Sequence, residues 1–218
     1  MKTIILLLTV ATLGSTLGVA QDPGLALTGG LGDGPLGALI ATIGNKGPIR
    51  ASFTERRFFP IRKEPTVLSG IIRISQERGL SLAYTRPEPL ILIADPWGLI
   101  MRDARGRDRQ VPVGSREAGA IGSLLPIMGF DLSALAAHFD IRALGGPQDW
   151  RLEFRPKDPG APNPLGTIIV DGAFTEVTRI EFRRSSNQRI EIEVHDTQTG
   201  VVFTPEEVRR YFRTQRPR

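Results

Sequence analysis

Between Leu68 and Asp95, apolar residues recur at every second position in three successive segments. Successive side chains of a strand point to opposite faces of a sheet, so every second residue shares a face. The pattern therefore predicts three strands, each with one aliphatic face. The faces consist of Leu68, Gly70, Ile72 and Ile74, then Leu80, Leu82 and Tyr84, then Leu90, Leu92 and Ala94.

The third segment is apolar on both faces, because Ile91 and Ile93 occupy the positions in between. A strand with two apolar faces is normally covered on both sides. We therefore expect other elements to pack on each side of the sheet at this point. So much aliphatic surface either packs in an ordinary core or encloses an apolar ligand.

Further strands are predicted before and after this region. One candidate covers residues 49–59, and the meander continues briefly at 97–101 and 109–113, with Arg105-Gly106 at a turn. Alternation returns in the C-terminal part, at 150–155, 178–182 and 189–194. Hairpin turns are expected at Asp171-Gly172 and at Ser185-Ser186-Asn187. The result is a long antiparallel sheet with a polar outer face.

A helical period appears in two places besides the C-terminus. The first helix starts at Pro35, carries one apolar stripe and stops at Gly44 and Gly47; the stripe is Leu36, Leu39, Ile40 and Ile43. The second place is an insertion up to Gly145-Gly146-Pro147, with a weak helix on Ala118, Ile121, Leu125 and Met128. Asp131 is expected to cap a further short helix with Leu132, Leu135, Ala136 and Phe139 on one face. Thr204 and Glu207 form a capping box for a last helical turn.

The first twenty residues have the pattern of a secretory signal peptide. Lys2 provides the positive start, residues 4–13 are apolar, and Gly18-Val19-Ala20 precedes Gln21, which predicts cleavage after Ala20. An uncleaved membrane anchor is the alternative, although the apolar run is short for spanning a bilayer. Residues 21–34 are a Gly-rich leader, 35–213 one domain, and 214–218 a basic tail.

Composition narrows the function classes. Without Lys2 the chain has 27 basic and 23 acidic residues, a mild excess of +4. Nucleic-acid binding is not expected of an exported chain without aromatic base platforms. The chain has no cysteine, so it has no disulfide or thiol chemistry, which is consistent with a periplasmic location.

Chemistry-bearing residues are few. The two histidines, His138 near Asp140 and His195 beside Asp196, have no nucleophile motif nearby and too few companions for a zinc site. We therefore expect that the protein is not an enzyme and that it binds no metal ion or cofactor. An envelope enzyme using His138 with Asp140 remains an alternative, and replacing His138 with alanine would separate it from a binding protein.

Four short motifs occur in a recognisable order. Ala51-Ser52-Phe53-Thr54-Glu55 is followed by Leu68-Ser69-Gly70-Ile71-Ile72 and Tyr84-Thr85-Arg86-Pro87-Glu88. Trp150-Arg151-Leu152-Glu153-Phe154-Arg155-Pro156-Lys157 follows the helical insertion. This series resembles that of LolA-like outer-membrane lipoprotein carriers and spans roughly residues 35–203, as a divergent branch of that family.

The resemblance implies an α+β fold, a half-open antiparallel β-barrel whose helical lid encloses an apolar cavity for acyl chains. It implies a monomeric periplasmic carrier or chaperone for lipoproteins or another lipid or glycolipid, between an inner-membrane exporter and an outer-membrane acceptor. The expected cavity residues are Ile72, Ile74, Leu80, Leu82, Tyr84, Leu90, Leu92, Trp97, Leu99 and Met101. The expected lid residues are Ile121, Leu124, Leu125, Met128, Leu132 and Leu135.

One departure from the family pattern concerns the lid. The classical carriers have an Arg-Pro after the second strand, and its arginine holds the lid closed. This sequence has Gln76-Glu77 at that place, followed by Arg78. The sequence therefore does not show how the lid is held closed or which cargo the protein binds. The alternative function on the same fold is a lipid sensor or scaffold in an envelope complex.

Overall fold

The computed structural model describes residues 35–111, 126–127, 132–157 and 166–214. Their strands form one antiparallel sheet of eleven, in the order β6-β5-β4-β3-β2-β1-β11-β10-β9-β8-β7. The first six strands are β1 (Ile49–Phe58), β2 (Thr66–Ser75), β3 (Gly79–Arg86), β4 (Leu90–Asp95), β5 (Gly98–Asp103) and β6 (Asp108–Gln110). The other five are β7 (Phe139–Gly146), β8 (Asp149–Pro156), β9 (Thr167–Ala173), β10 (Glu176–Ser185) and β11 (Gln188–Thr199).

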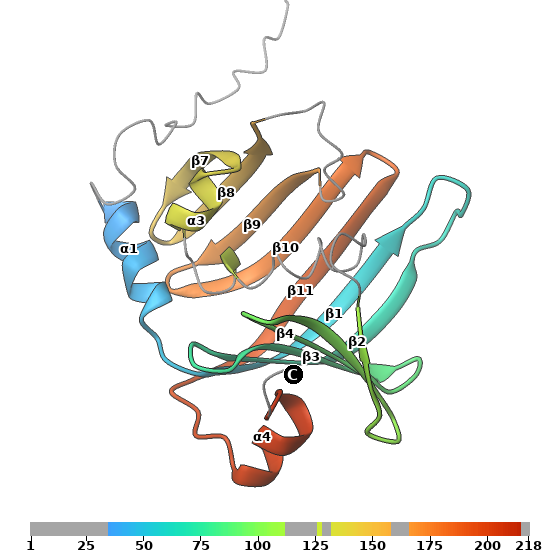
Figure 1. The fold of residues 1–218 in the computed structure, drawn as a ribbon. Coiled ribbons are helices and arrows are strands. Elements are labelled where there is room, and N and C mark those ends of the chain that lie inside the picture. Colours follow the sequence, from blue (N-terminus) through green and yellow to red (C-terminus); the bar gives the residue numbers. More distant parts are fainter. Residues whose placement is uncertain (1–34, 112–125, 128–131, 158–165, 215–218) are drawn as a thin grey trace, which may run out of the picture.

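The sheet does not close into a complete barrel, because β6 and β7 remain as its two edges. It bends about β1 and β11, so that β7 to β10 lie on one side and β2 to β5 on the other (Figure 1). The helices α1 (Pro35–Gly44), α3 (Leu132–Ala136) and α4 (Pro205–Tyr211) are short. None of the helices in the described ranges is long and apolar enough to cross a membrane.

The concave face of the sheet holds the hydrophobic core. All three expected strands of the 68–95 region are confirmed, and each contributes its predicted aliphatic face. Strands β7 to β11 add a second set of apolar side chains to the same cluster. This second set is Phe139, Ile141, Ala143, Trp150, Leu152, Phe154, Ile168, Val170, Ile180, Phe182 and Ile192.

The outer face of β2 to β5 is covered by the C-terminal helix, α4, which lies on the opposite side of the sheet from α3 (Figure 1). The expected Thr204–Glu207 capping box is present at its start. Arg102 donates hydrogen bonds from its guanidinium to the carbonyls of Arg209 and Arg210, at 2.9 and 2.7 Å. This cover explains why Ile93 is fully buried although it points away from the concave face.

Two elements differ from the prediction. Phe139 begins β7 rather than ending a helix, and the alternation of Phe139, Ile141 and Ala143 with Asp140 and Arg142 had been masked by the preceding helical period. Since the chain turns back at Gly146, this segment pairs with β8 along its whole length.

The turn expected at Asp171-Gly172 lies three residues later, at Phe174 and Thr175. Gly172 is instead inside β9, where a Cβ atom would lie 2.0 Å from Cζ2 of Trp150. The glycine therefore makes room for the tryptophan ring on the neighbouring strand. Trp150 in turn donates from Nε1 to the Phe174 carbonyl at 2.8 Å, which ties the ring to the observed turn.

Candidate functional site

The concave face brings together nine of the ten residues expected in the cavity. Seven are buried in one hydrophobic cluster, namely Ile72, Ile74, Leu80, Leu82, Tyr84, Leu92 and Leu99. Leu90 and Met101 are partly buried and pack against the same cluster. Because alternate residues of paired strands share a face, a period of two in the sequence was enough to gather them.

Trp97 is the one residue of the ten that does not belong to this cluster. It lies in the turn between β4 and β5, and 44% of its surface is exposed. Its backbone N–H donates to Oδ1 of Asp95 at 2.9 Å, which is the hydrogen bond of a tight turn. The alternation of a strand does not extend through a turn, so the position of Trp97 could not be counted from its neighbours.

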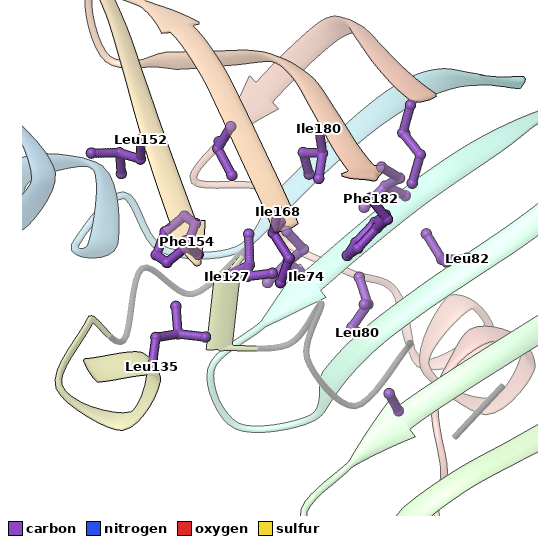
Figure 2. Close-up of a cluster of buried hydrophobic side chains, with 14 of the residues drawn as sticks. Ile74, Leu80, Leu82, Ile127, Leu135, Leu152, Phe154, Ile168, Ile180 and Phe182 are labelled. Carbon is purple, nitrogen blue, oxygen red and sulfur yellow. The ribbon is translucent and has the colours of Figure 1, made fainter. Parts of the chain in front are cut away.

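Part of the insertion lies on the concave face. Leu132 and Leu135 of α3 are buried in the same cluster as the sheet residues, together with Ile127, which the sequence pattern did not single out. Figure 2 shows Ile127 and Leu135 among Phe154, Ile168 and Ile74. The other expected lid residues lie outside the described part of the chain, and these are Ile121, Leu124, Leu125 and Met128.

A lysine from the last family-like motif holds α3. Lys157 Nζ donates to the carbonyl of Ala136, the last residue of α3, at 2.6 Å, and its backbone N–H donates to the His138 carbonyl at 3.1 Å. A cation suits the exposed carbonyls at a helix C-terminus. Gln76, at the position of the family's latch, donates instead to the Gly44 carbonyl at the end of α1. In the described residues, therefore, Lys157 is a side chain that ties α3 to the sheet.

A polar cluster of Glu55, Arg57 and Tyr84 interrupts the apolar face. The Tyr84 hydroxyl donates to Oε2 of Glu55 at 2.7 Å, and Arg57 Nε donates to Oε1 of the same carboxylate. Glu55 is almost fully buried, whereas the Arg57 side chain is 37% exposed. The cluster thus reaches from the core to the end of the sheet where β1 turns into β2.

The sequence pattern missed Glu55 and Arg57, although a signal for them was present. They follow Ala51 and Phe53 at every second position, so they had to share the concave face with those residues. Charged residues at inward positions of a strand are unusual and often mark a functional site. What could not be read was their partner, since Tyr84 comes from β3, 29 residues later than Glu55.

The electrostatics of this cluster keep Tyr84 neutral and Arg57 charged. Burial of the hydroxyl, and then the negative charge of Glu55, raise the pKa of Tyr84 far above its usual value. Burial opposes the charge on Arg57, but the Glu55 carboxylate outweighs this and raises the pKa of Arg57. The site therefore offers a neutral phenol and a partly exposed guanidinium that is paired with Glu55.

We expect the raised pKa of Tyr84 to make the protein less stable in alkali. A tyrosine in the unfolded chain loses its proton near pH 10 while folded Tyr84 keeps it, so the free energy of unfolding falls as the pH rises above about 10. Tyr84→Phe should remove this part of the pH dependence, and at neutral pH should lower stability by about 1–2 kcal/mol through the lost hydrogen bond. Urea unfolding of both proteins at neutral and alkaline pH measures the difference.

An optical titration provides the check on that prediction. The chain has two tyrosines, Tyr84 and Tyr211. If Tyr84 is held protonated, tyrosinate absorbance should show a step that coincides with unfolding, and this step should be absent in Tyr84→Phe. Ionisation of Tyr84 in the folded protein at its ordinary pKa would contradict the structure.

A small recess opens in the concave face beside α1. Its apolar lining comes from Ile43, Ile49, Ala51, Ile72, Val177 and Val194, and its polar lining from Lys46, Thr175, Glu176, Thr197 and Thr199. Ile72 connects this recess to the expected cavity residues. The recess lies at the opposite end of the sheet from the Glu55–Arg57–Tyr84 cluster, since Ile49 starts β1 and Arg57 is near its end.

The histidines are not part of this arrangement. His138 is exposed in the turn between α3 and β7, and His195 lies at the surface with Nε2 4.0 Å from Glu193 Oε2. Among the described residues, no group of three or more His, Cys, Asp or Glu side chains is placed to hold a metal ion.

No protein-family model matches the sequence, and no curated protein is similar to it. In structure, the chain is similar to a LolA superfamily protein from Nitrosomonas europaea, with 8% identity, a TM-score of 0.46, and 81% of this chain and 97% of that chain covered. The MucA/MucB complex of Pseudomonas aeruginosa gives 12% identity and a TM-score of 0.45, over 78% of this chain and 58% of that one, less than two thirds of its length. A DUF1329 family protein from Desulfovibrio piger gives 9% identity and a TM-score of 0.42, over 79% of this chain and 96% of that one.

The chain resembles these proteins in the course of its backbone, at low sequence identity. TM-scores below 0.5 describe a distant likeness of chain course, and nothing about function follows from them. The function has to come from the residues of this chain.

Proposed function

We propose that this protein is a periplasmic carrier that shelters the acyl chains of lipoproteins, or of another acylated lipid, on the concave face of its sheet during transfer toward the outer membrane. The observation that carries this proposal is the apolar lining of the concave face, to which both halves of the bent sheet contribute. In the described part of the chain, Ile127 and the five-residue helix α3 lie on this face.

The energetics favour such a carrier. Burial of an acyl chain yields about 0.8 kcal/mol per methylene, so a chain of sixteen carbons represents roughly 13 kcal/mol of transfer from water. A permanently empty cavity large enough for such an acyl chain would cost a large part of a domain's stability. Side chains such as Ile127, Leu132 and Leu135 avoid that cost by occupying the concave face, and an acyl chain would take their place.

The attachment of α3 is suited to such an exchange. A five-residue helix has little stability of its own and depends on its tertiary contacts. Among the described residues, a side-chain hydrogen bond from Lys157 to the Ala136 carbonyl holds its C-terminal end. Exchange of Leu132 and Leu135 for an acyl chain keeps the apolar face covered throughout, so the barrier is mainly the release of this segment.

The polar end of the ligand would lie at the Glu55–Arg57–Tyr84 cluster. A carrier of acyl chains must leave the headgroup or peptide in water while it buries the chains. Arg57 is partly exposed at the end of the apolar face and offers guanidinium donors there. The ester or phosphate oxygens of an acylated lipid are acceptors of the kind it binds.

We expect the purified protein to bind a long-chain fatty acid with a fluorescent polyene tail. Binding is measured by the change in emission of the fatty acid when it moves from water into the protein. Leu68→Asp places a charge on the concave face of β2 and should weaken binding at least about tenfold. Val67→Asp changes the adjacent residue, which is 53% exposed on the outer face, and should leave the affinity unchanged. Lys157→Met should speed association, because it frees the C-terminal end of α3.

The matched pair makes the proposal open to refutation. Equal loss of binding in Leu68→Asp and Val67→Asp, with both proteins folded, would show that the ligand does not use the concave face. No binding by the wild-type protein would reject the proposal outright. A protein that binds the fatty acid but does not release it to vesicles would be a sensor rather than a carrier.

A further inference from the structure

The hairpin between β1 and β2 projects from one end of the sheet (Figure 1). Strand pairing with β11 stops at Phe58, and pairing between β1 and β2 stops where Arg57 faces Thr66. The six residues 59–64 beyond this point are all exposed. The tip is therefore free of contact with the core.

The tip is an ordered turn that displays apolar side chains. The Arg62 N–H donates to the Phe59 carbonyl at 3.1 Å, and Pro60 occupies the turn position where its fixed φ is favoured. Ile61, at the next position, is 94% exposed, and Phe59 is 40% exposed. These two large apolar side chains lie outside the core, within three residues of a projecting turn, which indicates a surface that meets a partner.

Cations lie directly beside these apolar groups. The Arg62 guanidinium carbon is 5.7 Å from the centroid of the Phe59 ring, and Lys63 follows it at the tip. Arg62 also donates to the Thr66 hydroxyl at 3.2 Å, which holds it close to the turn. Glu64 is the single acidic residue of the six, so the tip itself carries a net positive charge.

More positive charge lies at the same end of the sheet. Arg86 ends β3, and Arg184 lies next to the β10–β11 turn, and both are exposed. Within the described part of the chain neither forms an ion pair. Glu88 is an exposed carboxylate two residues after Arg86, and with Arg184 the cations still outnumber it beyond the hairpin.

We propose that the β1–β2 hairpin tip docks the protein on a membrane surface that contains anionic phospholipid. Ile61 and Phe59 would enter the boundary between headgroups and acyl chains, where apolar and aromatic side chains are stabilised. Arg62 and Lys63 would lie at the level of the phosphates, which attract them. The apolar tip and its adjacent cations match the two layers that such a membrane presents.

Docking in this way would bring one end of the concave face to the bilayer. Arg57 is one residue from the end of β1 and belongs to the Glu55–Arg57–Tyr84 cluster, so the hairpin and this cluster lie at the same end. Membrane docking does not depend on acyl binding, because it uses the outside of the hairpin. The two proposals can therefore fail separately.

Sedimentation with vesicles tests the docking site. The wild-type protein should co-sediment with mixed phosphatidylglycerol and phosphatidylcholine vesicles at low salt, and far less with pure phosphatidylcholine. Phe59→Ser/Ile61→Ser should lower the partition coefficient at least about tenfold by removing the inserting groups. Arg62→Gln/Lys63→Gln should lower it by about tenfold, and should also weaken its dependence on salt.

Matched controls come from the opposite end of the sheet. Val202 is 88% exposed there, and its replacement by serine should leave partitioning unchanged. Lys46→Gln/Arg78→Gln also removes two positive charges, but near α1 and the β2–β3 turn. It should change the partition coefficient by less than twofold. Failure of the wild-type protein to bind anionic vesicles, or equal losses in the hairpin and control variants, would overturn the proposal and leave a protein as the partner of the tip.

Discussion

Replacing Phe212 with alanine is expected to lower the free energy of unfolding by about 3–5 kcal/mol. Phe212 directly follows α4, is fully buried, and has its ring centroid 5.3 Å from that of Phe203. Truncation of this side chain leaves a cavity beneath α4, the helix that lies on the outer face of the sheet in the described part of the chain. Urea unfolding followed by circular dichroism measures the change.

Phe174→Ala is the matched control. Phe174 lies in the β9–β10 turn with 62% of its surface exposed, and its replacement should change stability by no more than about 0.5 kcal/mol. The carbonyl that accepts from Trp150 belongs to the backbone and is kept. A loss below about 1 kcal/mol in Phe212→Ala would mean that α4 is not firmly packed on the sheet.

The attachment of α4 also depends on buried charge. Arg213 donates from Nε to Oδ2 of Asp95 at 2.5 Å, and both side chains are almost fully buried. The ring of Tyr211 lies 3.6 Å from the guanidinium carbon of Arg73, another buried arginine on the outer face. Ile93 and Ile100 are buried on this outer face, so the apolar surface left for a ligand is on the concave side.

Gly70→Ala is expected to lower the free energy of unfolding by about 2–3 kcal/mol. A Cβ atom at this position would lie 2.1 Å from the Ala83 carbonyl oxygen and 2.9 Å from Cε1 of Phe53. The first is backbone of the paired strand and cannot move without disturbing the β2–β3 register, which already shifts between Ser69 and Gly70. Thermal and urea unfolding would both report the loss.

The same substitution should disturb the candidate site. Phe53 and Tyr84 are the strand neighbours of Gly70, and their rings meet edge to face above it, with centroids 5.2 Å apart. Displacing Phe53 displaces Tyr84, so we expect Gly70→Ala to lose fatty-acid affinity as well as stability. Gly146→Ala is the control, because a Cβ atom there meets nothing within 4 Å. Equal stability of the two variants would contradict the close contact at Gly70.

The alternation of apolar residues determined which side chains line the concave face. Each strand from β2 to β4 presents the aliphatic face that its sequence predicts, because a period of two is a property of the extended backbone alone. The same reasoning required a cover on the second face of β4. Local signals also determined the start of α1 and the capping box of α4, since both involve residues within one turn of each other.

Tertiary structure alone decided which element provides that cover and which groups meet across strands. The bonds from Tyr84 to Glu55 and from Arg102 to Arg209 join residues 29 and 107 positions apart, and no local period encodes such pairs. The position of Trp97 could not be derived from the alternation of the strands, because Trp97 lies in a turn, where the alternation does not continue. The role of Lys157 could not be predicted either. Its hydrogen-bond partner is the backbone carbonyl of Ala136, and every residue type has such a carbonyl.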